Sequence, residues 1–218
     1  MRGVRRRAAL PVCALAAGLF LAAGCATTFQ RISGEEAAGA REFFAASAAL
    51  PFPIEASYSG VAEVSGRTLP FIAGVNSRSS AEETVGFYDL LGGPVLFLAN
   101  DGKTVTLSRG RASGKILPPN LPPLKSGPVS LGRILSGAPG YPVEGGDVGR
   151  TPDGGWIYRD GRQRLYSDPP RRLLSRAEYY FPGKRVVVSY PERGMTGPPP
   201  LVKIEVSGAK IVLRRDVE

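Results

Sequence analysis

Apolar and polar residues alternate with a period of two along most of the chain after residue 54, which is the pattern of half-buried β-strands. In the first run, from Ile54 to Val64, apolar or small residues occupy every second position. Turns with glycine, such as Asp160-Gly161 and Pro182-Gly183, separate the later runs, so consecutive runs are predicted to pair as antiparallel hairpins. The predicted strands cover 54–65, 69–75, 84–89, 95–99 and 104–109 in the first half, and 156–159, 162–167, 173–181, 185–190, 201–206 and 210–215 in the second.

Two segments have helical spacing instead. Residues 34 to about 50 are rich in alanine, carry two acidic residues in the first turn and end before Pro51, as a helix does. A second, short helix is predicted from Ser130 to about Gly137. Each has one apolar side with which it can cover a sheet. The residues of this predicted helical lid are Phe43, Phe44, Leu131, Ile134 and Leu135.

The two groups of strands are joined by residues 116–124, whose prolines exclude a helix and predict an extended loop. Residues 140–155 also have the composition of a loop. About eleven antiparallel strands form a strongly curved sheet, and two helices are few to cover it. The sequence therefore predicts a single, mainly β (α+β) domain over 34–218, with either a hollow interior under a helical lid or a solid core. The side chains predicted to face inward are Tyr58, Phe71, Phe87, Phe97, Tyr158, Tyr180, Val188 and Ile204.

The N-terminus has a different character. Four arginines within the first seven residues precede the uncharged, apolar run Ala8–Ala23. This run is shorter than the about 20 residues that span a bilayer, which favours an export signal over a permanent anchor. The small residues directly before Cys25 resemble the bacterial lipobox. That resemblance implies removal of residues 1–24 as a lipoprotein signal peptide and lipidation of Cys25.

Lipidation would leave residues 25–33 as a short tether, so that the domain works close to a membrane. Two or more acyl chains anchor a protein stably. Ala26, rather than aspartate, follows the cysteine, and by resemblance to bacterial sorting rules this favours the periplasmic face of the outer membrane. Cys13 would leave with the signal, so no disulfide is expected.

Composition narrows the chemistry further. The 218-residue chain has no histidine, which excludes the usual serine or cysteine triad and any histidine-ligated zinc site. Four of its arginines belong to the signal segment, so the net charge of +9 gives no argument for a nucleic-acid partner. The acidic candidates lie among turn glycines, where aspartate commonly forms turns. We therefore expect no enzyme activity, no metal and no cofactor besides the lipid. These acidic residues are Glu144, Asp147, Asp153 and Asp160.

Four stretches of the sequence carry a family resemblance. They are Gly60–Val64, Tyr88–Leu98, Asp101–Leu107 and Tyr190-Pro191. They resemble the LolA/LolB superfamily of lipoprotein-localisation factors, over about residues 34–217, and the lipobox places the chain nearer the outer-membrane receptor (LolB) branch. The resemblance implies an unclosed β-barrel whose helical lid covers a hydrophobic cavity. That cavity would hold acyl chains of lipoproteins or lipids, and a soluble periplasmic carrier would be a further partner.

The resemblance also implies a membrane-insertion loop. In the receptor branch a leucine directly before a glycine helps to drive cargo into the bilayer, and Leu90, Leu91 and Gly92 match this position. Because Gly-Gly-Pro cannot continue a strand, the two leucines are predicted to lie in a turn. The residues alone leave open whether they are exposed or fold back into the core.

Two functions follow from these patterns. The first is an outer-membrane-anchored lipoprotein that binds acyl chains of lipoproteins or lipids in a hydrophobic cavity and helps to deliver them to the outer membrane. The alternative is a non-catalytic envelope lipoprotein whose solid β-domain binds a protein or a glycan. A continuous apolar hollow that is open at one end would favour the first.

Overall fold

The computed structural model describes residues 29–48, 52–79, 82–101, 104–110, 124–125, 130–169, 173–192 and 198–216. The signal segment, Cys25 and the proline-rich run before Leu124 lie outside these described residues. No helix within them is long and apolar enough to cross a membrane.

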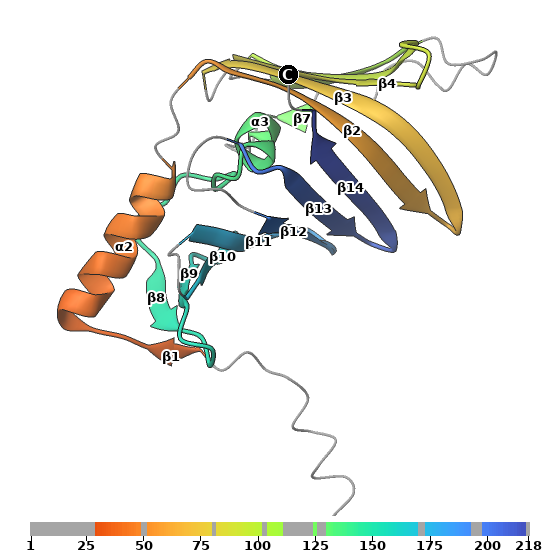
Figure 1. Cartoon of the computed structure of the whole chain (residues 1–218). Coiled ribbons are helices and arrows are strands. Elements are labelled where there is room, and N and C mark those ends of the chain that lie inside the picture. Colours follow the sequence, from red (N-terminus) through yellow and green to blue (C-terminus); the bar gives the residue numbers. More distant parts are fainter. Residues whose placement is uncertain are drawn as a thin grey trace, which may run out of the picture.

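One antiparallel sheet of fourteen strands forms most of the molecule, and its order is β1-β8-β9-β10-β11-β12-β13-β14-β2-β3-β4-β5-β6-β7. The two ends of this order do not pair with each other, so the sheet curves without closing (Figure 1). The prediction of a mainly β, curved and unclosed antiparallel sheet with few helices is confirmed. The strands are β1 (Gln30–Arg31), β2 (Ile54–Val64), β3 (Arg67–Ser79), β4 (Glu82–Tyr88), β5 (Pro94–Asn100), β6 (Thr104–Arg109), β7 (Leu124–Lys125), β8 (Asp147–Arg150), β9 (Trp156–Arg159), β10 (Gln163–Asp168), β11 (Leu173–Phe181), β12 (Lys184–Glu192), β13 (Leu201–Val206) and β14 (Ala209–Arg215).

The eleven strands predicted from alternation correspond to β2–β6 and β9–β14. Three short strands were not predicted. The prediction that 140–155 is a loop is wrong for β8, which pairs with β9 on one side and with β1 on the other. Strand β1 lies inside the predicted tether, so residues 30 and 31 belong to the sheet. Strands of two to four residues are too short to show alternation, and whether they form depends on the strand with which they pair.

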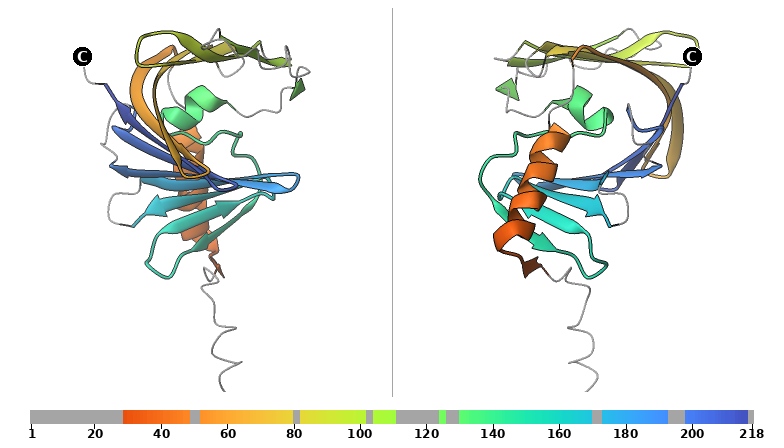
Figure 2. Two further views of the ribbon diagram at one scale, coloured as in Figure 1. Left: turned by 90° about the vertical axis from the view of Figure 1, so that its right-hand side faces the viewer. Right: turned by 60° about the vertical axis from the view of Figure 1, so that its left-hand side comes forward.

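Both helices lie on the concave side of the sheet (Figure 1, Figure 2). Helix α2 (Gly34–Ala48) contacts β8, β9 and β11, and α3 (Leu131–Leu135) contacts β3 and β4. Phe44 of α2 is fully buried, with its ring centroid 5.9 Å from that of Tyr158. The helices and the sheet share one hydrophobic core.

Helix α3 is held at both ends by side chains of the sheet. At its start, the buried carboxylate of Glu83 in β4 accepts hydrogen bonds from the Leu131 and Gly132 amides (2.8 and 2.9 Å) and from the Ser130 hydroxyl (2.5 Å). At its end, the hydroxyl of Tyr58 donates to the Leu135 carbonyl. The Tyr190 hydroxyl donates to the carbonyl of Ile134. A five-residue helix leaves its terminal amides and carbonyls without helical partners, and here the sheet supplies them.

We expect Glu83→Gln to lower the free energy of unfolding by about 2 to 3 kcal/mol, because hydrogen bonds to a charged group are strong and an amide would place donors against donors. The measurement is chemical denaturation. Glu82→Gln is the matched control, since Glu82 is the residue next to Glu83 and its carboxylate is exposed in a surface ion pair with Arg78. It should change stability by less than about 0.5 kcal/mol. Equal effects of the two substitutions would contradict the anchoring role of Glu83.

Candidate functional site

The concave face carries apolar side chains whose exposure rises from one end to the other. Near the helices they are fully buried, as Val188 is. Farther along the same face, Phe71, Phe87 and Ile204 are only partly buried and pack against the edge of the core. The final residues of this face are exposed, with Leu69 at 55%. We call this partly exposed apolar strip of the concave face the apolar trough and define it by Phe71, Phe87, Ile204 and Ile211, with Val64, Leu69 and Phe181 at its exposed end.

Strand register explains why these residues share a face. Phe71 pairs with Gly60 across β2 and β3, and a Cβ on Gly60 would lie 2.5 Å from the Phe71 ring. Glycine is therefore needed at this position for the ring to lie flat over the neighbouring strand. The Phe71 and Phe87 rings lie 5.7 Å apart between centroids and join β3 to β4. On the other side, Ile204 pairs with Ile211.

Three of the residues predicted to face the cavity are completely buried. Tyr58, Tyr158 and Val188 have no exposed surface, because α2 and α3 pack against this part of the sheet. Burial raises the pKa of Tyr58 to about 12, and its hydroxyl bonds the end of α3. The deep half of the concave face is thus filled by the protein's own side chains, as in the solid-core alternative, and the open trough is the other half.

Two further residues of that set, Phe97 and Tyr180, lie on the convex face, which corrects the prediction that they face inward. Phe97 packs edge-on against Tyr88, with 5.5 Å between ring centroids. The Tyr180 hydroxyl donates to Glu178 at 2.6 Å. The neighbour of Tyr180, Tyr179, is the inward residue, and its hydroxyl accepts a hydrogen bond from the Gly140 amide. Where adjacent residues are both aromatic or apolar, alternation does not show which of them faces inward, and no other pattern in these two strands resolves it.

The residues of the predicted lid all lie against the sheet or the core. Phe43 contacts Phe44 and Trp156, with ring centroids 5.0 and 5.8 Å apart. Ile134 and Leu135 are buried, and Leu131 packs at the edge of the core.

The turn between β4 and β5 presents two leucines to solvent. Leu90 is 63% exposed and Leu91 is 97% exposed, so neither folds back into the core. The Asp89 carboxylate holds the turn by accepting hydrogen bonds from the amides of Leu91 (2.9 Å) and Gly93 (2.7 Å). Gly92 has φ +79°, which favours glycine. The turn thus has a defined shape although its leucines are exposed.

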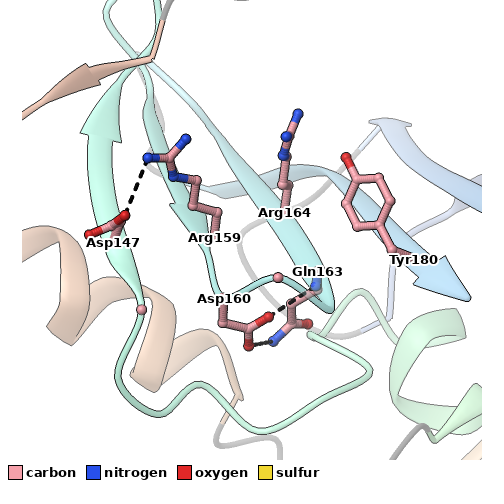
Figure 3. A pocket seen from close by; sticks show the side chains of 8 residues that line it. Asp147, Arg159, Asp160, Gln163, Arg164 and Tyr180 are labelled. Carbon is pink, nitrogen blue, oxygen red and sulfur yellow. Dashed lines mark hydrogen bonds and ion pairs between the residues drawn. The ribbon is translucent and has the colours of Figure 1, made fainter.

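A polar hollow of about 600 Å³ lies on the convex side of β8–β10 (Figure 3). Its acidic residues are engaged within the protein. Asp147 binds Arg31 at 2.6 Å and Arg159 at 3.2 Å. Asp160 accepts hydrogen bonds from the amides of Arg162 and Gln163 and so shapes the β9–β10 turn. Within the described ranges, no group of three or more Cys, Asp or Glu residues is placed to hold a metal ion.

A charged network covers the next strands of the convex face. The Glu178 carboxylate is only 3% exposed and binds Arg176 (2.7 Å), Arg185 (2.6 Å) and the Tyr180 hydroxyl. Burial by itself would raise the pKa of Glu178, but the tyrosine hydroxyl and the two guanidinium groups outweigh it and lower the pKa. Sequence reasoning did not find this network, because it depends on the parity of β11, which carries Arg176, Glu178 and Tyr180, and on the hairpin that brings Arg185 of β12 to them.

Comparison with known proteins supports the fold assignment. No protein-family model and no curated protein sequence matches the chain. Among solved structures, it is similar to a LolA superfamily protein from Nitrosomonas europaea, with a TM-score of 0.52 and 14% identity over 83% of this chain and 91% of that chain. It is also similar to a DUF1329 family protein from Desulfovibrio piger, with a TM-score of 0.50 and 11% identity over 84% of this chain and 92% of that one. The chain therefore has a LolA-like fold.

The lowered pKa of Glu178 has a consequence for stability. Because the folded protein holds this carboxylate ionised more strongly than the unfolded chain does, its contribution is fully present above the usual pKa of 4.5 and is lost as the pH falls below it. We expect Glu178→Gln to lower the free energy of unfolding at pH 7, and the gap from the parent protein to narrow below pH 4.5. Denaturation over this pH range measures it, and a gap independent of pH would contradict the assignment.

Proposed function

We propose that the protein is a lipid-anchored envelope protein that binds acyl chains of lipoproteins or lipids and helps to deliver them to the outer membrane. The observation that carries this proposal is the apolar trough, which continues from the packed core to exposed residues at one end of the sheet. The LolA-like fold supports it. The proposed action is binding and transfer, without bond chemistry.

The energetics of acyl transfer require such a surface. Each methylene moved from an apolar environment into water costs about 0.8 kcal/mol, so lipoprotein chains with some tens of methylenes cannot cross water unshielded. In the proposed complex the chains lie along Phe71, Phe87, Ile204 and Ile211, because the deep half is occupied by α2 and α3. Binding there requires no movement of the buried tyrosines.

The proposed membrane-insertion loop is the turn with Leu90, Leu91 and Gly92. Its leucines are exposed, and the Asp89 carboxylate holds the backbone of the turn that carries them. Two leucine side chains transferred from water into the acyl region of a bilayer gain a few kcal/mol, roughly 1.5 to 3 kcal/mol each. This gain would favour the membrane-bound state in which cargo leaves the trough. In its more specific form, the proposal is that the protein belongs to the receptor branch and receives its cargo from a soluble periplasmic carrier.

The proposed anchor is a lipid on Cys25, placed at the periplasmic face of the outer membrane. The first described residue, Phe29, is four residues later and packs beneath the guanidinium of Arg159, 3.7 Å from its ring centroid. The free tether would therefore span at most about 14 Å, which keeps the domain next to the bilayer.

A second candidate function is binding of a protein or glycan partner by the convex face. The hollow of Figure 3 supports it, because Arg159, Arg164 and Tyr180 line it with guanidinium groups and an aromatic ring. Its occupants would be polar, whereas those of the trough would be apolar, so the two candidates make opposite predictions for an acyl probe.

The acyl-binding proposal is tested by two substitutions at adjacent positions. Ile211 faces the trough, whereas Val212, the next residue of β14, faces the convex side and is also half-buried. We expect Ile211→Glu to weaken binding of a fluorescent fatty-acid probe at least about tenfold, because a carboxylate would lie against the chain. Val212→Glu should leave the affinity within about twofold. Circular dichroism checks that both variants fold.

Equal loss in both variants, or no probe binding by the parent protein, would contradict the trough as the binding surface. In the second case, binding of a peptide or an oligosaccharide with sensitivity to Arg164→Ala would favour the second candidate.

Cys25→Ala tests the anchor. Without the thiol no diacylglycerol can be attached, so mass spectrometry should find no acyl chains on the protein. Cys13→Ala is the matched control and should not change the acyl mass. Acyl chains on Cys25→Ala at the parent level would contradict the proposed lipidation.

A further inference from the structure

Five hairpin turns lie along the same end of the sheet. In an antiparallel sheet every second connection falls at the same end, and the strand order places the β9–β10, β11–β12, β13–β14, β2–β3 and β4–β5 turns together. Register confirms this for two of them, since Ala209 beside one turn pairs with Val64 beside another. Figure 1 shows these two hairpins, β13–β14 and β2–β3, ending side by side. We call this end of the sheet the turn rim; its turns are centred on 65–66, 90–92, 160–162, 182–183 and 207–208.

The exposed large apolar residues of the described chain gather at the turn rim. Each lies within four residues of one of its turns, and none lies at the opposite end of the described strands. Solvent-exposed apolar residues that cluster in this way mark an interaction surface, whereas scattered ones need no explanation. They are Val61, Val64, Leu69, Leu90, Leu91, Val95 and Phe181.

The rim is also the open end of the trough. Val64, Leu69 and Phe181 belong to the concave side by strand parity, because Val64 follows Ala62 at a spacing of two and Phe181 follows Tyr179. A partner that covers them therefore covers the mouth of the trough as well. Arg67 and Lys184 are exposed at the turns themselves. Arg67 is two residues before Leu69 in the sequence, and Lys184 is three residues after Phe181. This combination suits a phospholipid surface, where apolar tips enter the acyl boundary and cations meet headgroup phosphates.

The proposed lipid anchor favours a bilayer over a protein partner, because it would hold the domain next to a membrane. The tether begins at the strands of one edge of the sheet, where Gln30 pairs with Arg150 and Arg150 with Trp156, at the end of β8 and β9 away from the 160–162 turn. Leu90 and Leu91 belong to the rim near the other edge, between β4 and β5.

We propose that the whole turn rim, and not the β4–β5 turn alone, docks on the surface of a phospholipid bilayer, so that the trough opens directly into the acyl region. This inference rests on the proposed function, which it deepens by naming the docking surface and its orientation. An acyl chain would then pass from the trough into the membrane past Leu69 and Phe181 without crossing water.

Site-specific labelling tests the orientation. Leu69→Cys, Phe181→Cys and Leu91→Cys are made in the full chain, labelled with an environment-sensitive fluorophore and reconstituted in vesicles of phosphatidylethanolamine and phosphatidylglycerol. Glu82→Cys, at the opposite end of the sheet, is the control. The parent chain reports any labelling of its own two cysteines. We expect a blue shift and quenching by nitroxide-bearing acyl chains for labels at 69, 181 and 91, and neither change at 82.

Quenching at 91 alone would overturn rim docking while leaving insertion of the β4–β5 turn. Quenching at all four positions, or at none, would also overturn it. The fatty-acid probe assay is made in solution and needs no vesicles. If the parent protein does not bind the probe while the labels at the rim are quenched, the result counts against the proposed function and not against the docking surface. Circular dichroism of each variant excludes misfolding as the cause of a missing signal.

Discussion

The placement of α3 inside the curve of the sheet determines how much of the concave face stays open, and the buried carboxylate of Glu83 is central to that placement. A five-residue helix has little stability by itself, since almost all of its amides and carbonyls are terminal. Glu83 satisfies the amide end, and hydroxyls from β2 and β12 satisfy carbonyls at the other end. With the helix fixed there, Ile134 and Leu135 fill the deep half, and the apolar residues beyond them stay only partly buried.

The sheet itself could be predicted from the sequence because its main strands bury only one face. Alternation from Ile54 to Val64 gave both the existence of β2 and the inward direction of Tyr58. The same reasoning failed for Phe97, which lies within the uniformly apolar run of β5, and for Tyr180, which follows a second tyrosine. Where both neighbours are apolar, the partner strand decides the parity, and that information is absent from the local sequence.

The candidate site was predictable to a similar degree. The trough residues Phe71, Phe87 and Ile204 follow from alternation, and the place of Leu91 in a turn follows from Gly-Gly-Pro, whereas its exposure had stayed open and comes from the structure. The position of α3 did not follow, because it depends on bonds between residues 47 to 77 positions apart in the chain. Nor did the Glu178 network, which requires the parity of β11 and the register of the β11–β12 hairpin.

The hydrogen bonds at the two ends of α3 differ in strength, and in the proposed complex this difference would limit how deeply an apolar ligand can enter the concave face. The start of the helix is bound through a charged carboxylate with three donors, whereas the end is bound through single bonds from the neutral hydroxyls of Tyr58 and Tyr190. Hydrogen bonds between neutral groups contribute roughly 1 kcal/mol each, about half of a charged one. A chain that entered deeper than the trough would therefore displace the Leu135 end first. Its gain would be about 0.8 kcal/mol for each methylene buried, which would have to offset two such bonds and the burial of Ile134 and Leu135, roughly 1.5 to 3 kcal/mol each. In the proposed complex, the depth of binding would thereby be coupled to the length of the acyl chain through the weaker end of one short helix.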